Sequence, residues 1–255
     1  MKVLISFFIL FFFFTALEGQ VKKISSTSRP PKFIITAALI YDYSFSSNTD
    51  VLTFSDTYDP VTQMHYFSSN TYAVQFGLGV LTEGKMAVDK KRKIRLTGSL
   101  SYNHFYNTRN SGMNRTRWQF LNIGSGIEYN FQPKEKNNSF IGCELLYTLM
   151  WGAWQSDIIY PDGFKSNIYT KFHPTSRLGF ALKTGTELRL SKNKSFMIGI
   201  RVVWANIVPK QNKYADGAYV TYINDSENSG GISLGSPKQI VFLQLMTGIN
   251  FRIKK

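Results

Sequence analysis

Hydrophobic and polar residues alternate over long stretches of this chain, and the clearest example is residues 177–190, RLGFALKTGTELRL. From Leu178 to Leu190 every second residue is apolar or threonine, and the residues between them are glycine, alanine or charged. A β-strand directs successive side chains to opposite faces. The stretch therefore predicts a strand with one apolar face and one face of small or charged side chains.

The same alternation occurs in seven other stretches. The predicted strands are residues 32–45, 71–88, 94–106, 116–131, 139–151, 177–190, 195–207 and 238–253. Within the fourth stretch, residues 117–120 break the alternation, which we interpret as a β-bulge or as a segment above a membrane.

The predicted connections are alternately long and short along the chain. Long polar segments follow the first, third, fifth and seventh strands, and short polar turns follow the others. Two long connections contain hairpin patterns, residues 157–172 around Pro161-Asp162-Gly163 and residues 214–223 around Asp216-Gly217. The count is eight strands if these hairpins stay outside the sheet and ten if they join it, and the pattern leaves both open.

The N-terminal segment has the features of a secretory signal. A lysine at position 2 precedes an unbroken apolar run over residues 3–14 and small residues before position 20. We predict a signal peptide over 1–19, a flexible leader over 20–31 and a β-barrel domain over 32–255. The remaining chain has no apolar run near the ~20 residues that a membrane-spanning helix needs.

Export, eight alternating strands and alternating connection lengths together predict an all-β fold, an eight-stranded antiparallel up-and-down transmembrane β-barrel. A soluble sandwich gives no reason for long and short loops to alternate. A lipocalin is the strongest soluble alternative, but its interior holds an apolar ligand, whereas the inward positions here are charged. We expect an integral protein of the cell outer membrane of a Gram-negative bacterium.

The predicted lumen contains charges of both signs. An eight-stranded barrel is just wide enough to be filled by side chains, and buried charges are costly unless they pair. We therefore predict a sealed barrel in which carboxylates neutralise Arg and Lys. The members of this lumen charge network are Asp42, Glu83, Arg95, Glu128, Glu144, Lys183, Glu187, Arg189, Arg201 and Arg252.

Aromatic residues concentrate near the strand ends, as in the aromatic girdles at the two membrane interfaces. The girdle nearest the long loops is predicted to contain Tyr43, Tyr72, Tyr106, Trp151 and Trp204. The girdle at the other end is predicted to contain Tyr129, Phe131, Phe196 and Phe251.

The formal net charge of +14 is compatible with nucleic acid or an anionic membrane surface as a partner. The basic residues do not gather on one helix or beside a nucleic-acid motif, so no nucleic acid is expected. Many of them lie in the short turns and at the C-terminal end, where they are either solvated residues that keep this end out of lipid or contacts to anionic phospholipid headgroups of the inner leaflet. These residues are Lys90, Lys91, Arg92, Lys93, Lys134, Lys136, Lys192, Lys194, Lys254 and Lys255. The single cysteine, Cys143, excludes an internal disulfide and is predicted to face lipid.

The sequence contains no recognisable catalytic or metal-binding constellation. A nucleophilic site needs a serine and a carboxylate near a histidine, but Ser101 is predicted on the opposite strand face from His104. His65 and His173 are predicted in long loops. Metal-site spacings and glycine-rich phosphate loops are also missing, so we predict no enzyme, no cofactor and no metal.

The whole chain from residue 32 resembles the small eight-stranded outer-membrane barrels of the OmpA/OmpX kind. The resemblance rests on topology and alternation and implies a monomer inserted by the outer-membrane barrel insertion machinery, with lipopolysaccharide outside and phospholipid inside. It implies a structural, adhesive or surface-interaction role carried by the long loops. The alternatives are a small porin-like channel and a lipid A-modifying acyl hydrolase or transferase. Many such barrels end on an aromatic residue, whereas here Phe251 is followed by Arg-Ile-Lys-Lys.

Overall fold

The computed structural model describes nine segments of the chain, residues 31–44, 54–59, 64–69, 76–110, 114–159, 165–208, 228–229, 232–233 and 240–253. The predicted signal peptide, residues 20–30 of the predicted leader, the predicted hairpin at 214–223 and Tyr72 lie outside these segments. Within them, no helix is long and apolar enough to cross a membrane.

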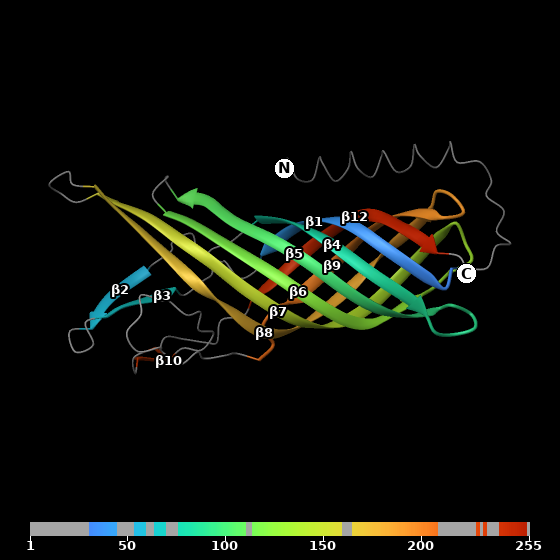
Figure 1. Cartoon of the computed structure of the whole chain (residues 1–255), viewed down its shortest axis with the longest axis horizontal. Coiled ribbons are helices and arrows are strands. Elements are labelled where there is room, and N and C mark those ends of the chain that lie inside the picture. Colours follow the sequence, from blue (N-terminus) through green and yellow to red (C-terminus); the bar gives the residue numbers. More distant parts are fainter. Residues whose placement is uncertain are drawn as a thin grey trace.

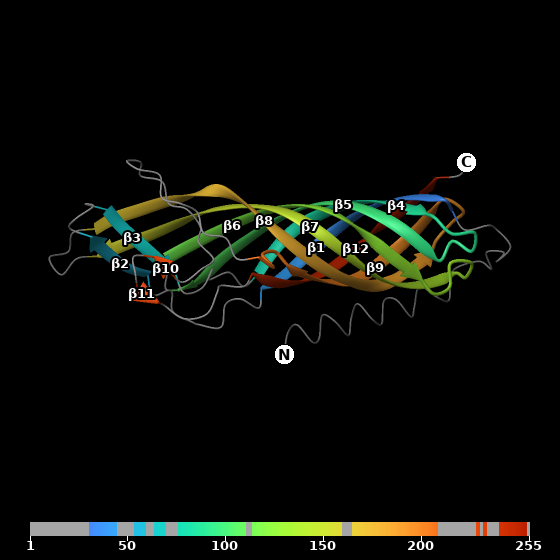
Figure 2. The ribbon, with the colours of Figure 1, turned by 90° about the horizontal axis from the view of Figure 1, so that it is seen from below.

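Eight strands form a closed antiparallel barrel in which every strand pairs with its neighbours in the chain and β1 pairs with β12 (Figures 1 and 2). The barrel strands are β1 (Phe33–Ser44), β4 (Phe76–Ala87), β5 (Ile94–Asn110), β6 (Asn114–Asn130), β7 (Asn137–Ile159), β8 (Lys165–Arg189), β9 (Lys194–Trp204) and β12 (Val241–Ile253). This confirms the predicted fold class, an all-β, eight-stranded antiparallel barrel.

Two small hairpins lie outside this ring as separate two-stranded sheets. One pairs β2 (Phe54–Asp59) with β3 (Met64–Ser69), and the other pairs β10 (Asn228–Ser229) with β11 (Ile232–Ser233). The sequence pattern did not predict either hairpin. Neither hairpin adds a strand to the barrel, so the described strands close at eight rather than ten.

Side chains alternate between the outside of the barrel and its lumen. In β1 the odd-numbered residues Ile35 to Tyr43 point outward and the even-numbered residues Ile34 to Ser44 are buried. Leu39 and Leu145 are 67% and 68% exposed, and Cys143 also lies on the outer face. The outer face is therefore a wide apolar surface, which a protein in water would bury.

Three short turns, at 88–93, 131–136 and 190–193, lie at one end of the barrel, which we call the short-turn end. In the first turn the Asp89 carboxylate accepts a 2.8 Å hydrogen bond from the backbone N–H of Ile94, and Arg92 adopts the left-handed conformation with φ of 57°. Slight burial raises the pKa of Asp89, but hydrogen bonds from backbone N–H groups lower it by more, so that the pKa lies below its ordinary value. The opposite end is the long-loop end.

Two of the predicted long connections are mostly strand. β5 continues to Asn110, and β6 already begins at Asn114. In the same way β7 continues to Ile159, and β8 begins at Lys165. The predicted hairpin at 157–172 is the tip of the β7–β8 pair. The regular alternation of apolar residues does not extend into these segments, although the backbone ladder continues through them.

The predicted bulge at residues 117–120 does not occur. β5 and β6 keep one register from Ile94 opposite Tyr129 to Asn107 opposite Thr116, and the only shift lies beyond that point. Trp118 and Phe120 are buried in the lumen. The alternation is reversed here, because the polar residues Arg117 and Gln119 lie on the outer face and the aromatic residues lie in the lumen. The other interpretation, a segment above a membrane, stays a prediction.

Gly126 lies where β6 and β7 approach closely, since a Cβ atom there would collide with the carbonyl oxygen of Cys143 and lie 2.8 Å from Cα of Glu144. Gly126→Ala should therefore destabilise the barrel by about 1–3 kcal/mol. Gly98→Ala is the matched control, because a Cβ atom there has nothing within 4 Å. Urea midpoints of both variants in detergent micelles, followed by heat-modifiable migration, check this; equal midpoints would contradict it.

Candidate functional site

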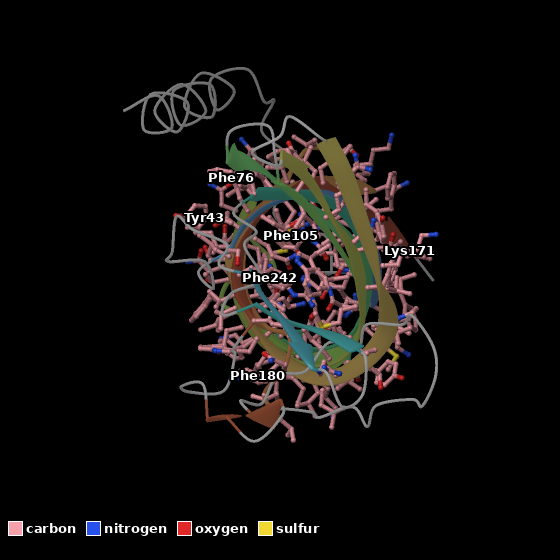
Figure 3. The ribbon with its side chains drawn as sticks, turned by 90° about the vertical axis from the view of Figure 1, so that its left-hand side faces the viewer. Tyr43, Phe76, Phe105, Lys171, Phe180 and Phe242 are labelled. Atoms are coloured by element: carbon pink, nitrogen blue, oxygen red, sulfur yellow. The ribbon has the colours of Figure 1, made fainter. Side chains whose placement is uncertain are left out.

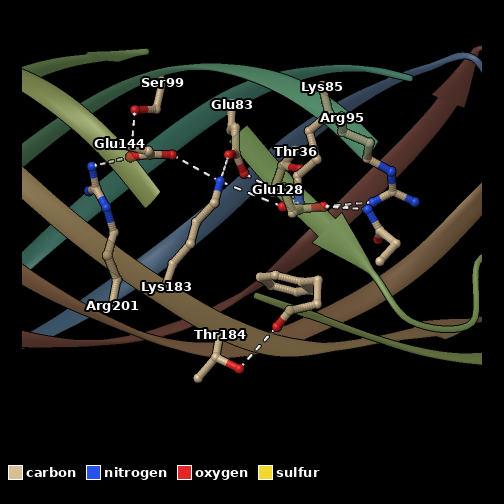
Figure 4. Close-up of polar contacts among 12 residues, drawn as sticks. Thr36, Glu83, Lys85, Arg95, Ser99, Glu128, Glu144, Lys183, Thr184 and Arg201 are labelled. Carbon is tan, nitrogen blue, oxygen red and sulfur yellow. Dashed lines mark hydrogen bonds and ion pairs between the residues drawn. The ribbon is translucent and has the colours of Figure 1, made fainter. Parts of the chain in front are cut away.

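The lumen contains a large set of buried charged side chains (Figures 3 and 4). Its buried charged side chains are Asp42, Glu83, Lys85, Arg95, Glu128, Glu144, Arg177, Lys183, Glu187, Arg189, Arg201 and Arg252. All ten predicted members lie there. Sequence reasoning missed Lys85 and Arg177, although both continue the alternation that selected Glu83 and Lys183.

The first group of contacts, near the short-turn end, joins two carboxylates to two cations. Arg95 Nη1 lies 2.9 Å from Glu128 Oε1 and 2.8 Å from Glu187 Oε1. Lys85 Nζ lies 2.9 Å from Glu128 Oε2, 3.4 Å from Glu187 Oε1 and 4.6 Å from the ring centroid of Phe140. Each of the two carboxylates thus faces two cations, which offsets the cost of removing these charges from water.

The second group lies farther into the barrel and is centred on Lys183 (Figure 4). Lys183 Nζ contacts Oε1 of Glu83, and lies 2.9 Å from Glu144 Oε1 and 3.5 Å from Glu128 Oε2. Arg201 Nη2 lies 2.6 Å from Glu144 Oε2. Because Glu128 also contacts Lys85, the two groups form one continuous network across strands that are far apart in the sequence.

Neutral polar side chains extend this network toward the long-loop end. Arg201 donates a 2.9 Å hydrogen bond to Gln244, and the Gln244 amide donates one of 2.8 Å to Asp42. Asn103 donates a second 2.8 Å hydrogen bond to Asp42. The prediction paired Asp42 with a cation, but within the described residues it has no ion pair, and two amide donors satisfy its carboxylate instead.

Two predicted members, Arg189 and Arg252, lie nearest the short-turn end. Arg252 lies in the lumen as expected, but no carboxylate of the described segments is within ion-pair distance of it. The prediction that every lumen charge pairs is therefore wrong for Arg252. Strand alternation predicts which face a side chain lies on. It does not predict which side chains lie at the same height along the barrel axis and can therefore pair.

The half of the lumen toward the long-loop end holds a cluster of apolar side chains, of which the sequence pattern placed only part on the inward face. The rings of Phe105, Phe120 and Phe242 pack together with centroids 5.1–5.5 Å apart, and Figure 3 shows Phe105 and Phe242 inside the ring of strands. The buried cluster consists of Phe105, Trp118, Phe120, Leu146, Met150, Ala181, Val203, Ala205, Ile240 and Phe242. We call it the aromatic plug. Extending the alternation of β6 toward its start would have found two of its members.

The lumen does not assemble a nucleophilic site from the described residues. Ser101 is buried in the lumen, whereas His104 lies on the outer face of β5 with its ring 6.2 Å from that of Tyr106. His65 and His173 lie in β3 and β8. In the described segments, no group of three or more His, Cys, Asp or Glu side chains is placed to hold a metal ion.

Aromatic side chains lie at both ends of the outer face. Near the long-loop end, Tyr43 and Phe76 make an edge contact with ring centroids 5.5 Å apart. At the other end Tyr129 and Phe131 make one at 5.3 Å, and Lys93 Nζ lies 5.8 Å from the Tyr129 centroid. The structure places the following predicted girdle residues on the outer face: Tyr43, Tyr106, Trp151, Trp204, Tyr129, Phe131, Phe196 and Phe251.

No family model matches this chain, and no curated protein matches its sequence. Among solved structures it is similar to Neisserial surface protein A (12% identity, 87% of this chain, 97% of that one, TM-score 0.46). It is also similar to the outer membrane protein OprG from Pseudomonas aeruginosa (11% identity, 91% of this chain, 100% of that one, TM-score 0.48). A third similar structure is Ail, the attachment invasion locus protein of Yersinia pestis (9% identity, 87% of this chain, 96% of that one, TM-score 0.40). The expected resemblance to small outer-membrane barrels is confirmed for the fold alone, which the closed strand order establishes by itself.

Replacing Glu128 with glutamine should destabilise the barrel strongly. The change keeps the shape of the side chain but removes the negative charge that Lys85, Arg95 and Lys183 share. Breaking a buried pair typically costs about 3–5 kcal/mol. Glu135→Gln, in an exposed turn, is the matched control and should change stability by less than about 0.5 kcal/mol. Urea unfolding in micelles compares the two, and equal midpoints would show that the network contributes little.

Proposed function

We propose that this protein is an integral barrel of the bacterial outer membrane that carries a surface-interaction site on the projecting β7–β8 hairpin and has a sealed lumen. The observation that carries the surface role is the length of this hairpin. The apolar outer face supports the membrane location, and the filled lumen supports the sealed barrel.

The outer face fits a lipid bilayer. It is apolar between two sets of aromatic side chains, and β1 and β4 have 12 residues each, close to the 9–11 that a tilted strand needs to cross. Outer-membrane barrels have short periplasmic turns and long extracellular loops. By this rule the short-turn end, with its lysines, faces the periplasm and inner-leaflet phospholipid, and the long-loop end faces lipopolysaccharide and the cell exterior.

The β7–β8 hairpin is much longer than a membrane crossing requires. β7 has 23 residues and β8 has 25, whereas β9 next to β8 has 11. The excess of 11 to 13 residues over β1, at about 3.3 Å per residue, corresponds to roughly 35–45 Å of strand. Figure 1 shows both strands extending beyond the others at the long-loop end. Ordered strands that project this far present a rigid surface for a partner outside the cell.

The channel alternative is disfavoured by what fills the lumen. Ion pairs and amide hydrogen bonds cross its inner half, and the aromatic plug closes its outer half. The proposal also assigns no catalytic activity, since Ser101 and His104 lie on opposite faces of β5. It includes a monomer delivered by the barrel insertion machinery, as the resemblance implies.

The sealed lumen predicts a negative result in planar bilayers. The purified protein should insert without producing steady conductance steps, because the aromatic plug and the ion-pair network of the described residues fill the lumen. Insertion is verified separately by protease protection in liposomes. Steady nanosiemens currents from inserted protein would contradict the sealed lumen and favour a small channel.

Shortening the hairpin should remove surface binding while keeping the barrel. The variant deletes residues 156–168 and joins Gln155 to Tyr169, which face each other in the ladder, through an Asn-Gly turn. Bacteria displaying the full chain should adhere to cultured epithelial cells several-fold more than bacteria without it, and the shortened variant should lose most of this gain.

The control for this experiment deletes residues 55–68, which removes most of the β2–β3 hairpin. This hairpin also lies at the long-loop end (Figure 1). It should retain adherence. Heat-modifiable migration confirms that both variants are folded. Unchanged adherence of the β7–β8 variant, or no adherence gain from the full chain, would contradict the proposed surface role.

A further inference from the structure

Four polar side chains gather in the lumen at the short-turn end, on the three neighbouring strands β8, β9 and β12. In the ladder Arg189 faces Ser195, and Ser195 faces Asn250. Arg252 lies two residues beyond Asn250 on the same face of β12. All four are buried, and we call them the periplasmic-mouth cluster.

The cluster contains hydrogen-bond donors without acceptors. Arg252 Nε, Asn250 Nδ2 and Ser195 Oγ are buried and make no hydrogen bond. The orientation of the Asn250 amide is set from the other side, because its Oδ1 accepts a 2.7 Å hydrogen bond from Thr36. Buried polar atoms are nearly always satisfied in folded proteins, so this concentration of unused donors points to an acceptor supplied from outside the chain.

The charge balance points the same way. Within the described segments, Arg252 is a buried cation that forms no ion pair. Glu187 is the carboxylate whose charge acts on Arg252, but it already contacts Arg95 and Lys85. Arg189 and Arg252 act on each other as like charges. An anion beside Arg252 would offset this repulsion, and a buried cation without a counter-charge is costly.

The donor set identifies the class of anion. A guanidinium binds the oxygens of phosphate in a bidentate manner, and an amide and a hydroxyl can donate to the remaining oxygens. Phosphate offers several oxygens and more charge to donors that approach from three strands, so it should bind there more tightly than chloride, which is a single acceptor atom. An exposed lysine in the adjoining turn, Lys192, raises the local concentration of anions.

We propose that the periplasmic-mouth cluster is a phosphate-binding site, which takes either a soluble phosphate from the periplasm or the phosphate of an inner-leaflet lipid headgroup. This proposal does not rest on the surface-interaction role. A bound phosphate would link the ends of three strands near the point where β12 closes the barrel on β1, and would therefore stabilise that seam.

The test uses the full folded protein in a phosphate-free, non-ionic detergent. Inorganic phosphate should raise its thermal midpoint and give a saturable calorimetric signal, and sodium chloride of equal ionic strength should not. Arg252→Gln should weaken phosphate binding at least tenfold. Lys194→Gln, the matched control on an exposed side chain of β9, should stay within twofold of the native protein.

A second variant protects the test against misfolding of Arg252→Gln. Asn250→Asp keeps the acceptor for Thr36 and adds a carboxylate beside the guanidiniums, so it should raise the midpoint in phosphate-free buffer and abolish the response to phosphate. Displacement of phosphate by short-chain phosphatidylglycerol would identify a lipid headgroup as the source, and no displacement would identify a soluble phosphate. Both results support the site.

Two results would overturn the proposal. One is a native protein that responds to phosphate no more than to chloride, which would mean that water satisfies these donors. The other is phosphate binding that survives Arg252→Gln in a folded variant but is lost in Lys194→Gln, which would place the anion on the exposed turn.

Discussion

Closure of the sheet is the constraint on which the rest of this structure depends. Hydrocarbon offers no hydrogen-bonding partner, so a strand can cross a bilayer only if both of its edges are paired. The last pairing joins the two ends of the fold, Phe33 opposite Ile253, and runs along the whole of β1. Because the edges must meet, the number of strands and therefore the width of the lumen are fixed together.

A lumen of fixed width has to be filled, and here the filling changes along its length. Near the periplasmic end it consists of carboxylates, guanidiniums and ammonium groups in mutual contact. Toward the exterior it becomes amide hydrogen bonds around Asp42 and then the rings of Phe105, Phe120 and Phe242. The ion-pair network excludes water because separating its charges is costly, and the aromatic rings exclude water because they pack closely. A solute would have to disrupt both, which is why the surface rather than the lumen is the better place for function.

Much of this architecture could be predicted from the sequence because strand alternation has a strong physical cause. Lipid on one side and a polar lumen on the other impose it on every residue of β8 and β9 within the membrane. The prediction failed where that contrast ends. The extensions of β7 and β8 lack a regular alternation in the sequence, so they looked like loops. At the long-loop end of β6 the polar residues Arg117 and Gln119 lie on the outer face and Trp118 and Phe120 lie in the lumen, so the reversed alternation looked like a bulge.

Partner choice inside the lumen could not be predicted by the same reasoning. Alternation places Asp42 and Arg252 on the inner face, but barrel curvature and strand tilt decide which groups meet. Glu128 of β6 therefore meets Lys85 and Lys183, which come from strands on either side of it and at different levels. Lys85 was overlooked although the predicted strand 71–88 contains it two residues after Glu83, on the same face, and the ion pairs of the first group depend on it.

The outward position of Cys143 has a chemical consequence. In the proposed location, the exported chain would cross an oxidising compartment, where a single thiol can be captured as a mixed disulfide. Thiol–disulfide exchange needs access to the sulfur, and acyl chains around an outward-facing side chain would deny that access to soluble oxidants. Insertion would therefore protect the single cysteine of the chain as well as complete the fold, and slow assembly would expose this cysteine to oxidative trapping.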